Sequence, residues 1–481
     1  MSISDQYSVK NICIIGAGAA GLATLKVLKE SRQYRDGLWV PFVFEARENV
    51  GGVWLPAPPV DDPPLTPIYD SLTTNLPHSV MAYSDYSFPP STPVYPRASV
   101  VLTYLQSYAE HFGLIPHIQF NTTVSSVEHK PELDKWEVKV NTGETFTFDM
   151  IVVCNGHYRV PRYPNAPGLD DWLRRGKASH SVWYRHPERF GNTVLVVGAG
   201  PSGEDISADL LLADGSCIII RSITGAVNKD KGNLKIRGRL TRFEDVSLGQ
   251  VVFEDGTVEN GISYCIMATG YKASFPFLSK KLIQEGTPAL VPPLPSDPFN
   301  TTYGVFPLAK HIFPLKNTTI AFVALSLNII PFPLAECQAC AVFHAFSNPD
   351  ALDLLKESAE IITRYKLLRE SLGDDPFRVA KGWDVMGMTQ FDYRDQLCDF
   401  AMPSYGLAKV EKWVKVMYAN TFVLRQVWRM LEHSGEAEKW VDSVSEKQEW
   451  VQLLERLLDK VRELGLPVIN VNAMAYTSTI V

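Results

Sequence analysis

Residues 194–205, VLVVGAGPSGED, decide how the rest of the chain is interpreted. Four apolar residues typical of a buried parallel strand lead into Gly-x-Gly-x-x-Gly, and the residues behind it are typical of a helix start. The glycines permit a tight turn and let backbone N–H groups approach a pyrophosphate, whose charge is favoured at the positive end of the helix dipole. An isolated match of this kind is equally compatible with an ordinary glycine-rich turn.

A second copy of the pattern, NICIIGAGAAG at residues 11–21, favours the phosphate cradle. Glu45 ends the next apolar strand, 24 residues after Gly21, near the spacing of a carboxylate that accepts hydrogen bonds from ribose hydroxyls. An acid there suits an adenosine without a 2′-phosphate.

In the later copy the next strand, residues 216–220, ends in Arg221 and Ser222 instead of an acid. A planar cation can bind a 2′-phosphate that a carboxylate would repel, so the second nucleotide is predicted to be NADPH. An exposed arginine without a ligand is the structural alternative. Together the two fingerprints predict a protein that holds FAD permanently and NADPH transiently.

Length and composition narrow the classes of partner. The chain has 481 residues, 46% of them apolar, and a formal net charge of -7, which argues against nucleic acid and an anionic membrane surface. The longest apolar stretch, residues 320–334, is interrupted by Asn328, Pro331 and Pro333, and residues 1–10 are too polar and short for a signal peptide. Seven scattered cysteines fit a reducing compartment. We therefore expect a cytoplasmic protein without a membrane anchor.

The organisation predicted along the chain is two nucleotide-binding units and a helical end. Residues 1–165 are expected to form the first part of an FAD domain, residues 166–285 an inserted NADPH domain, and residues 286–481 the second part of the FAD domain with C-terminal helices. The proline-rich residues 57–67 are expected to be an irregular loop. Apolar spacing predicts helices at residues 99–112, 335–346, 350–372, 404–433 and 436–464. The fold class is therefore α/β, with two Rossmann-like dinucleotide-binding domains.

Several further motifs follow one another in a characteristic order. They are GAGAAGL (16–22), GGVW (51–54), YDSLTTNLP (69–77), YLQSYAEHFGL (104–114), HSVWYR (180–185), VLVVGAGPSGEDI (194–206), ATGY (268–271) and PFPLAECQA (331–339). In these the chain resembles the flavin-containing monooxygenase family of the class B flavoprotein monooxygenases, from about residue 10 to about residue 345.

The resemblance implies a mechanism. In the family, reduced flavin reacts with O2 to give a hydroperoxide at C4a, and NADP+ stays bound to shield it in a dry, pre-organised site. An asparagine at the position of Asn75 orients the nicotinamide and the hydroperoxide. An amide suits that task because it donates and accepts hydrogen bonds without a titrating charge. The substrate would be a small molecule with a nucleophilic nitrogen or sulfur, an amine or a sulfide, and a homodimer is compatible with the interpretation.

The predicted site residues fall into three groups. Those expected at FAD are Gly16, Gly18, Ala20, Gly21, Glu45, Gly52, Val53, Trp54, Thr74, Asn75, Val124 and Gln338. Those expected at NADPH are Tyr184, Gly198, Gly200, Pro201, Ser202, Gly203, Arg221, Ser222, Thr269 and Gly270. The family's linker signature, Phe-x-Gly-x-x-x-His-x-x-x-Trp or Tyr, is matched by Gly176, His180 and Tyr184. Arg174 stands at its first aromatic position, with Trp172 two residues earlier. No metal ligands are predicted.

Two rival functions share parts of this pattern. A flavin disulfide reductase would use a redox pair, and Cys337 and Cys340 have its Cys-x-x-Cys spacing. Two cysteines packed one turn apart on a helix is the favoured interpretation. Baeyer-Villiger oxygenation of a ketone uses the same fold, but its members favour Trp at the end of the linker signature, so Tyr184 favours heteroatom oxygenation.

Overall fold

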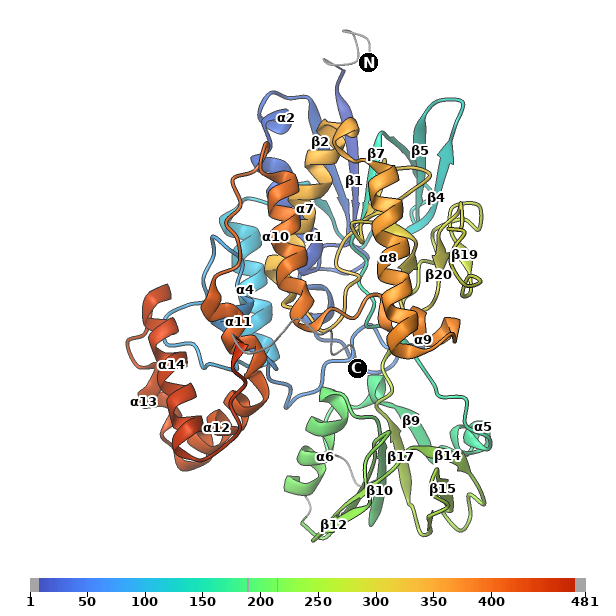
Figure 1. Cartoon of the computed structure of the whole chain (residues 1–481), viewed down its shortest axis with the longest axis vertical. Helices are drawn as coiled ribbons and strands as arrows, with labels where there is room; N and C mark the ends of the chain where they lie inside the picture. The colour runs from blue at the N-terminus through green and yellow to red at the C-terminus, as the bar shows by residue number, and fades with distance from the viewer. Residues whose placement is uncertain (1–7, 188–189, 214, 472–481) are drawn as a thin grey trace. The chain divides into compact units, whose positions relative to one another are not determined.

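The chain folds into two compact units in the computed structural model, which describes residues 8–187, 190–213 and 215–471. The first unit comprises Met1–Leu55, Thr73–Gly156 and Ala273–Val481, and the second comprises Pro56–Leu72 and His157–Lys272 (Figure 1). The expected domain borders were at residues 165 and 285, and the irregular segment 57–67 was expected in the first domain. The second unit is therefore made of two separate stretches of the sequence.

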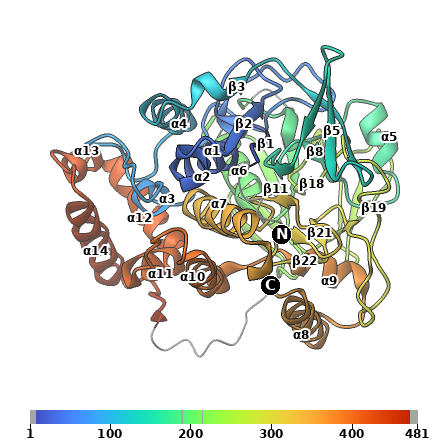
Figure 2. The same cartoon turned by 90° about the horizontal axis from the view of Figure 1, so that it is seen from above.

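The first unit is built on a five-stranded parallel sheet in the order β24-β7-β1-β2-β3. Alternate residues of the central strand β1 (Lys10–Ile15) face opposite sides, because successive side chains of a strand alternate. Ile12 and Ile14 belong to the core that includes α1 (Ala19–Glu30) and α7 (Pro331–Ser347), two helices that lie side by side (Figure 2). Cys13 and Ile15 belong to the core on the other face.

The bounds of the other strands of this unit follow. The parallel sheet also contains β2 (Trp39–Phe44), β3 (Ile118–Gln119), β7 (Met150–Val153) and β24 (Ile320–Phe322). An antiparallel sheet is formed by β4 (Val124–Lys130), β5 (Lys135–Val140) and β6 (Thr145–Phe148). Short strands are β19 (Gln284–Glu285), β20 (Phe299–Asn300), β21 (Val305–Phe306), β22 (Leu308–Ala309) and β23 (Phe313–Pro314).

Helices make up most of the last third of the chain. Besides α2 (Arg32–Arg35), α3 (His78–Met81) and α4 (Ala98–His111), the first unit contains α8 (Leu354–Leu372), α9 (Pro376–Trp383), α10 (Gln390–Ala401), α11 (Lys412–Ala419), α12 (Thr421–Ser434), α13 (Ala437–Val441) and α14 (Lys447–Glu463). Among the described residues, no helix has the length and apolar character needed to span a membrane.

The helices differ from the predicted ones in several places. The predicted helix 350–372 begins at Leu354, the predicted helix 404–433 is interrupted at Asn420, and the predicted helix 436–464 is interrupted at residues 442–446. Helix α7 begins at Pro331, four residues before the predicted start at residue 335, because proline is tolerated in the first turn, where its missing N–H has no intrahelical partner. Residues 404–411 are not helical, although a helix was predicted from residue 404. Helices α9 and α10 were not predicted at all.

The second unit is built on a six-stranded sheet in the order β12-β13-β11-β10-β17-β9, parallel except for β12. Its strands and helices are β8 (Val160–Pro161), α5 (Leu169–Arg174), β9 (Ala178–His180), β10 (Thr193–Val197), α6 (Pro201–Ala213), β11 (Ile218–Ser222), β12 (Lys229–Lys231), β13 (Leu234–Arg237), β14 (Leu240–Phe243), β15 (Val251–Phe253), β16 (Val258–Glu259), β17 (Tyr264–Met267) and β18 (Tyr271–Lys272). Trp172 of α5 is fully buried against Phe243 and belongs to the core of this unit. The predicted α/β class with two strand-turn-helix units is confirmed.

Candidate functional site

The first glycine turn connects β1 to α1 and packs tightly against its own unit. Gly16 has φ +101°, and a Cβ atom there would lie 2.6 Å from the Cys154 carbonyl oxygen. Gly52, from the second glycine pair of the sequence, approaches so closely that its Cβ would lie 2.8 Å from the Gly18 Cα. Only glycine at residue 52 lets its backbone come this close to the backbone of Gly18, and this contact restricts the conformation of the turn.

Glu45 lies directly beside this turn, at the carboxyl end of β2. Its side chain is 6% exposed. One carboxylate oxygen accepts a hydrogen bond from the Ala17 N–H at 2.7 Å, and the other accepts one from the Arg47 N–H at 2.8 Å. Burial raises the pKa of the carboxyl group, against the effect of these two bonds. A carboxylate in this place, next to a phosphate-type turn, can meet ribose hydroxyls, as FAD would require.

Asn75 has an exposed side chain between two buried neighbours. Thr74 is 3% exposed and Leu76 is 6% exposed. The Thr74 hydroxyl donates to the Leu76 carbonyl at 2.8 Å, and the Thr74 N–H donates to the Pro96 carbonyl at 2.9 Å. Within the described ranges the Asn75 side-chain amide has no hydrogen-bond partner. Its donor and its acceptor are therefore both available to a ligand.

The second glycine turn connects β10 to α6. Gly198 has φ +132°, and a Cβ atom there would lie 2.1 Å from the Ala268 carbonyl oxygen. A Cβ on Gly203 would lie 2.5 Å from the Gly198 carbonyl oxygen. Gly200 differs from both, because a Cβ there would meet no heavy atom within 4 Å. Space is thus left at the middle glycine, where the backbone of such a turn approaches a pyrophosphate.

Arg221, on β11, is the cation predicted to meet a 2′-phosphate. Its guanidinium is partly buried, and burial lowers its pKa while the opposite charge of Glu204 acts in the other direction. In the part of the chain that the structure describes, the buried Nε of Arg221 has no hydrogen-bond partner and its guanidinium forms no ion pair. Among the described residues no carboxylate therefore competes with a phosphate for this guanidinium.

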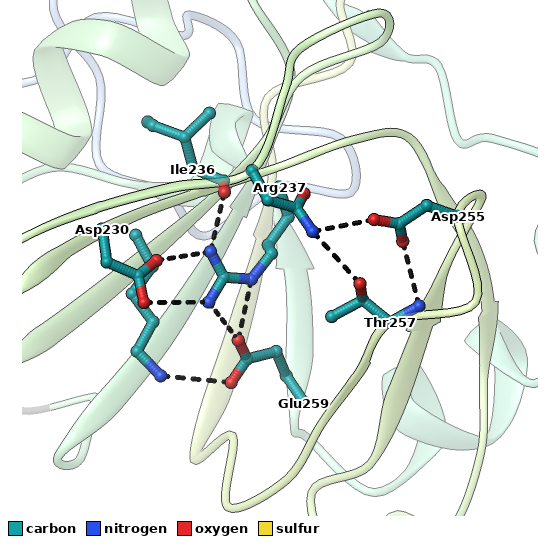
Figure 3. Close-up of polar contacts among 8 residues, drawn as sticks. Asp230, Ile236, Arg237, Asp255, Thr257 and Glu259 are labelled. Atoms are coloured by element: carbon teal, nitrogen blue, oxygen red, sulfur yellow. Dashed lines mark hydrogen bonds and ion pairs between the residues drawn. The ribbon is translucent and has the colours of Figure 1, made fainter.

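The neighbouring strand β13 carries a second arginine, Arg237, which is already neutralised (Figure 3). Its guanidinium donates to Asp230 at 2.5 Å and to Glu259 at 2.8 Å, and its side chain is 8% exposed. Two carboxylates leave Arg237 little capacity for a phosphate. Of these two arginines, Arg221 is therefore available to a ligand and Arg237 is part of the internal structure of the unit.

The linker signature lies within the second unit. His180 is fully buried, its Nδ1 accepts from the Val182 N–H at 3.1 Å, and its Nε2 lies 2.9 Å from the Gly270 carbonyl oxygen. This pairing requires the proton on Nε2. Burial lowers the pKa of His180 to about 4, so the ring is neutral near pH 7. The signature histidine thereby connects its segment to the ATGY motif.

Tyr184, the last residue of the signature, contacts the helix that follows the second turn. Its hydroxyl donates to Asp209 of α6 at 2.6 Å, and burial raises its pKa. The Ser71 hydroxyl donates to the same carboxylate at 2.9 Å, and the Tyr69 hydroxyl donates to Asp205, one turn earlier, at 3.1 Å. Sequence reasoning missed this role of Asp205 and Asp209, although their i, i+4 spacing after the turn was a visible signal.

Other predicted residues lie deeper in the protein. Gln338 of α7 is fully buried, accepting from the Ala324 N–H at 2.8 Å and donating to the Tyr393 hydroxyl at 3.0 Å. Ser222 is 3% exposed, and its hydroxyl donates to the Gly238 carbonyl at 3.0 Å. Val124, at the start of β4, is 8% exposed. Their contacts with FAD or NADPH stay predictions.

The remaining predicted residues lie on the same local elements. Thr269 donates to the Arg162 carbonyl at 2.5 Å beside Gly270, and Gly176 has φ +65° in the turn before β9. Ala20 and Gly21 lie in the first turn of α1, Val53 and Trp54 follow Gly52 in a short 3₁₀ helix, and Pro201 and Ser202 open α6. These assignments also stay predictions.

Cys337 and Cys340 lie one turn apart on α7, and both are buried free thiols. Burial raises the pKa of Cys340 well above its usual value. A reactive cysteine is partly exposed and has a lowered pKa. Cys340 has neither property, and Cys337, whose pKa is lowered by its hydrogen bond with Cys398, is buried. The packed arrangement on a helix is the one favoured by the sequence.

Comparison with known proteins identifies relatives along most of the chain. The family model described as "Flavin-binding monooxygenase-like" matches residues 9–227 and 227–291. Flavin-containing monooxygenase FMO GS-OX5 of Arabidopsis thaliana is 32% identical over 437 residues, which cover 84% of this chain and 86% of that protein.

Solved structures agree with the sequence relatives. The S-allyl-L-cysteine S-oxygenase from Allium sativum superposes with a TM-score of 0.71 at 28% identity, covering 94% of this chain and 99% of the other. An open crystal structure of cyclohexanone monooxygenase gives a TM-score of 0.54 at 13% identity, covering 82% of this chain and 98% of the other. The second likeness concerns the fold alone.

Proposed function

The chain belongs to the flavin-binding monooxygenase-like family, and from that premise we propose that it is an FAD- and NADPH-dependent enzyme that oxygenates the sulfur of a small thioether. The balanced reaction is R2S + O2 + NADPH + H+ giving R2SO + H2O + NADP+. The observation that carries the proposal is the difference between the two glycine turns: one has a carboxylate beside it, and the other has an arginine whose buried Nε lacks a partner within the described residues.

The residues present fit both cofactors. The first turn, with Glu45 beside it and Gly52 against it, would hold the adenosine and pyrophosphate of FAD. The second turn, with open space at Gly200 and with Arg221, would hold the pyrophosphate and 2′-phosphate of NADPH. Bound FAD supplies hydride acceptance and the activation of O2.

Asn75 would supply the polar contact at the reacting end of the cofactors. Its amide is exposed, and the buried residues on either side hold the backbone from which it projects. An amide can donate to one partner and accept from another without a change of charge. A thioether has no proton to lose when its sulfur attacks an electrophilic oxygen, so no catalytic base is required of this chain at that step.

Sulfur is preferred to nitrogen because of the relatives. The S-oxygenase of Allium sativum superposes over nearly its whole length at 28% identity. The ketone-oxidising relative is 13% identical and carries no argument about the substrate. A tertiary amine remains the alternative substrate class within the same chemistry.

The test is NADPH consumption by the purified, FAD-loaded protein in the presence of a thioether, a tertiary amine or a cyclic ketone, with peroxide measured in parallel. We expect sulfoxide formation, with one oxygen atom from ¹⁸O2. N-oxide as the main product would replace sulfur by nitrogen, and lactone as the main product would favour the Baeyer-Villiger alternative. Absence of any oxygenated product from all three would contradict the proposal.

A second experiment examines Asn75 itself. We expect Asn75→Ala to bind FAD and to be reduced by NADPH at close to the wild-type rate, while more of the consumed NADPH appears as peroxide. An unchanged ratio of product to peroxide would remove Asn75 from the proposed mechanism.

A further inference from the structure

The loop that carries Asn75 is held by a helix from the far end of the sequence. The Thr421 hydroxyl, at the first residue of α12, donates to the Asn75 carbonyl oxygen at 2.9 Å. The Arg425 guanidinium, one turn later on the same helix, donates to the Thr73 hydroxyl at 3.1 Å and to the Thr73 carbonyl at 3.5 Å. Two side chains of one helix face thus contact the backbone at and before Asn75.

Helix α12 is itself firmly anchored. Leu424, Val427 and Trp428 are each at most 1% exposed and belong to the large core of the first unit. Arg425 is only 9% exposed, so its bonds to Thr73 are made in a largely desolvated place. Hydrogen bonds from a charged donor are stronger than neutral ones, and a buried helix is a more exact support than a loop.

The opposite side of the same loop is fixed by the segment before α4. Thr73 pairs with Arg97 in an isolated antiparallel bridge, and the Thr74 N–H donates to the Pro96 carbonyl at 2.9 Å. The Tyr95 hydroxyl of that segment also reaches the Thr421 carbonyl, at 3.4 Å. The loop is therefore held by hydrogen bonds from α12 and from the segment before α4, while Asn75 is exposed.

We propose that Thr421 and Arg425 are positioning residues that fix the direction in which Asn75 presents its amide. The inference rests on the proposed function, because it assigns these residues a role through Asn75. Fixing the Asn75 carbonyl restricts the backbone dihedral angles on both sides of its Cα, and these set the direction of the side chain. The C-terminal helices would in this way contribute to the fraction of NADPH that ends in product, without contacting the substrate.

The first test removes the hydroxyl of Thr421. We expect Thr421→Val to speed hydrogen exchange of the backbone amides in residues 73–78, which all except Pro77 possess, roughly fivefold, the effect of losing one hydrogen bond. In the same variant more of the consumed NADPH should appear as peroxide, while the rate of flavin reduction stays near wild type. Thr421→Ser keeps the hydroxyl and should restore both quantities. Thr103→Val, which removes a threonine hydroxyl bond on α4, is the matched control and should change neither.

The second test addresses Arg425. Arg425→Met should increase exchange in residues 73–78 and the peroxide fraction, and Arg425→Lys, which keeps the charge but not the planar fork, should restore them only in part. Arg456→Met on α14 removes an exposed arginine that stacks on Trp440 and serves as the control. If Arg425→Met does not fold, the Thr421 series still decides the question.

The outcomes separate the inference from the proposed function. A Thr421→Val protein with faster exchange in residues 73–78 but a wild-type product fraction would overturn the inference, provided that Asn75→Ala lowers that fraction. Unchanged exchange in Thr421→Val would overturn it as well. If Asn75→Ala leaves the product fraction unchanged, the proposed role of Asn75 fails, and the exchange experiment still shows whether α12 holds the loop.

Discussion

In the first glycine turn the middle glycine, Gly18, lies against another backbone, and a Cβ there would be 3.3 Å from the Gly52 Cα, whereas in the second turn Gly200 has no heavy atom within 4 Å of the same position. The outer glycines behave alike, since Gly16 and Gly198 both have positive φ and both lie against a carbonyl oxygen. The two turns therefore share the geometry that forms them and differ in what covers them.

The charged residue beside the first turn has hydrogen-bond partners within its own unit, whereas the one beside the second turn has a donor without a partner in the part of the chain that the structure describes. Both oxygens of Glu45 accept hydrogen bonds from backbone N–H groups of their own unit. Arg221, in contrast, has a buried Nε without a partner among the described residues, while the adjacent Arg237 is neutralised. A covered, internally satisfied site suits a cofactor that stays, and an open site with an unsatisfied cation suits one that exchanges.

The largest expected effect concerns the feature that the turns share. Gly198→Ala should destabilise the second unit by more than about 3 kcal/mol, because the new Cβ meets a carbonyl oxygen and a positive φ is strained. Gly16→Ala should do the same in the first unit. Hydrogen exchange of β10 and β1 measures each unit separately. Equal protection in wild type and variant would contradict the packing described for that turn.

Buried histidines give the two units a common pH dependence. Burial lowers the pKa of His180 to about 4 and that of His78, in the first unit, to about 3. In the unfolded chain both histidines have a pKa near 6.5. Below that pH the unfolded state binds protons that the folded state does not, so the free energy of unfolding decreases as the pH falls from 6.5 toward 4 for His180 and toward 3 for His78. For His180 the full loss is about 3 kcal/mol.

Urea unfolding of wild type and His180→Asn measured at pH 7 and pH 5 checks this contribution. The wild-type free energy of unfolding should fall more than that of the variant between the two pH values. Equal falls would mean that His180 is not neutral in the folded protein.

Cofactor selectivity should depend on one arginine of the second unit and not on its neighbour. Arg221→Ala should raise the dissociation constant of NADPH about tenfold, or about 1.4 kcal/mol, and leave that of NADH unchanged. Arg237→Met should lower stability without changing the ratio of the two constants, because its partners are Asp230 and Glu259. Equal losses for NADH and NADPH in Arg221→Ala would remove the 2′-phosphate assignment.

The smallest expected effect on stability is that of replacing the middle glycine of the second turn, Gly200, and it should be smaller than the effect of replacing its counterpart Gly18. Gly200→Ala should change the free energy of unfolding by less than about 1 kcal/mol, since its Cβ meets nothing, yet it should weaken NADP+ binding. Gly18→Ala should cost more stability, because Gly52 must move. Urea unfolding measures the two stabilities, and titration with NADP+ measures binding. A wild-type dissociation constant of NADP+ in Gly200→Ala would show that the pyrophosphate does not approach that residue.

Local patterns in the sequence predicted the parts of the fold that depend on neighbours in the chain. A strand, a glycine turn and a helix are contiguous, so the turn at Gly16, the turn at Gly198 and the placement of Glu45 at the end of its strand could be inferred from spacing. Helix α7 begins earlier than predicted because the apolar stretch that runs to residue 334 favours a strand, whereas proline is also compatible with the first turn of a helix.

Contacts between segments far apart in the sequence leave no local pattern from which they could be predicted. Thr421 and Asn75 are 346 residues apart, and neither the threonine nor Arg425 belongs to a recognisable motif. Pro56–Leu72 has no periodicity, so nothing local indicated that it would fold with the second unit, where Tyr69 pairs with Asp205. The helices α9 and α10 were missed although Val379, Ala380 and Trp383 of the one and Leu397, Cys398 and Ala401 of the other have helical spacing, because each helix is too short for a long periodic run.

The order of strands in the first unit has a consequence for synthesis. Strand β24 pairs with β7, but the ribosome must translate everything from Val153 to Ile320 between them, which takes on the order of ten to thirty seconds. All strands of the second unit have been made by Lys272. The second unit can therefore complete its sheet before the first unit does. Until β24 has been synthesised, the edge of β7 in the first unit has no partner strand.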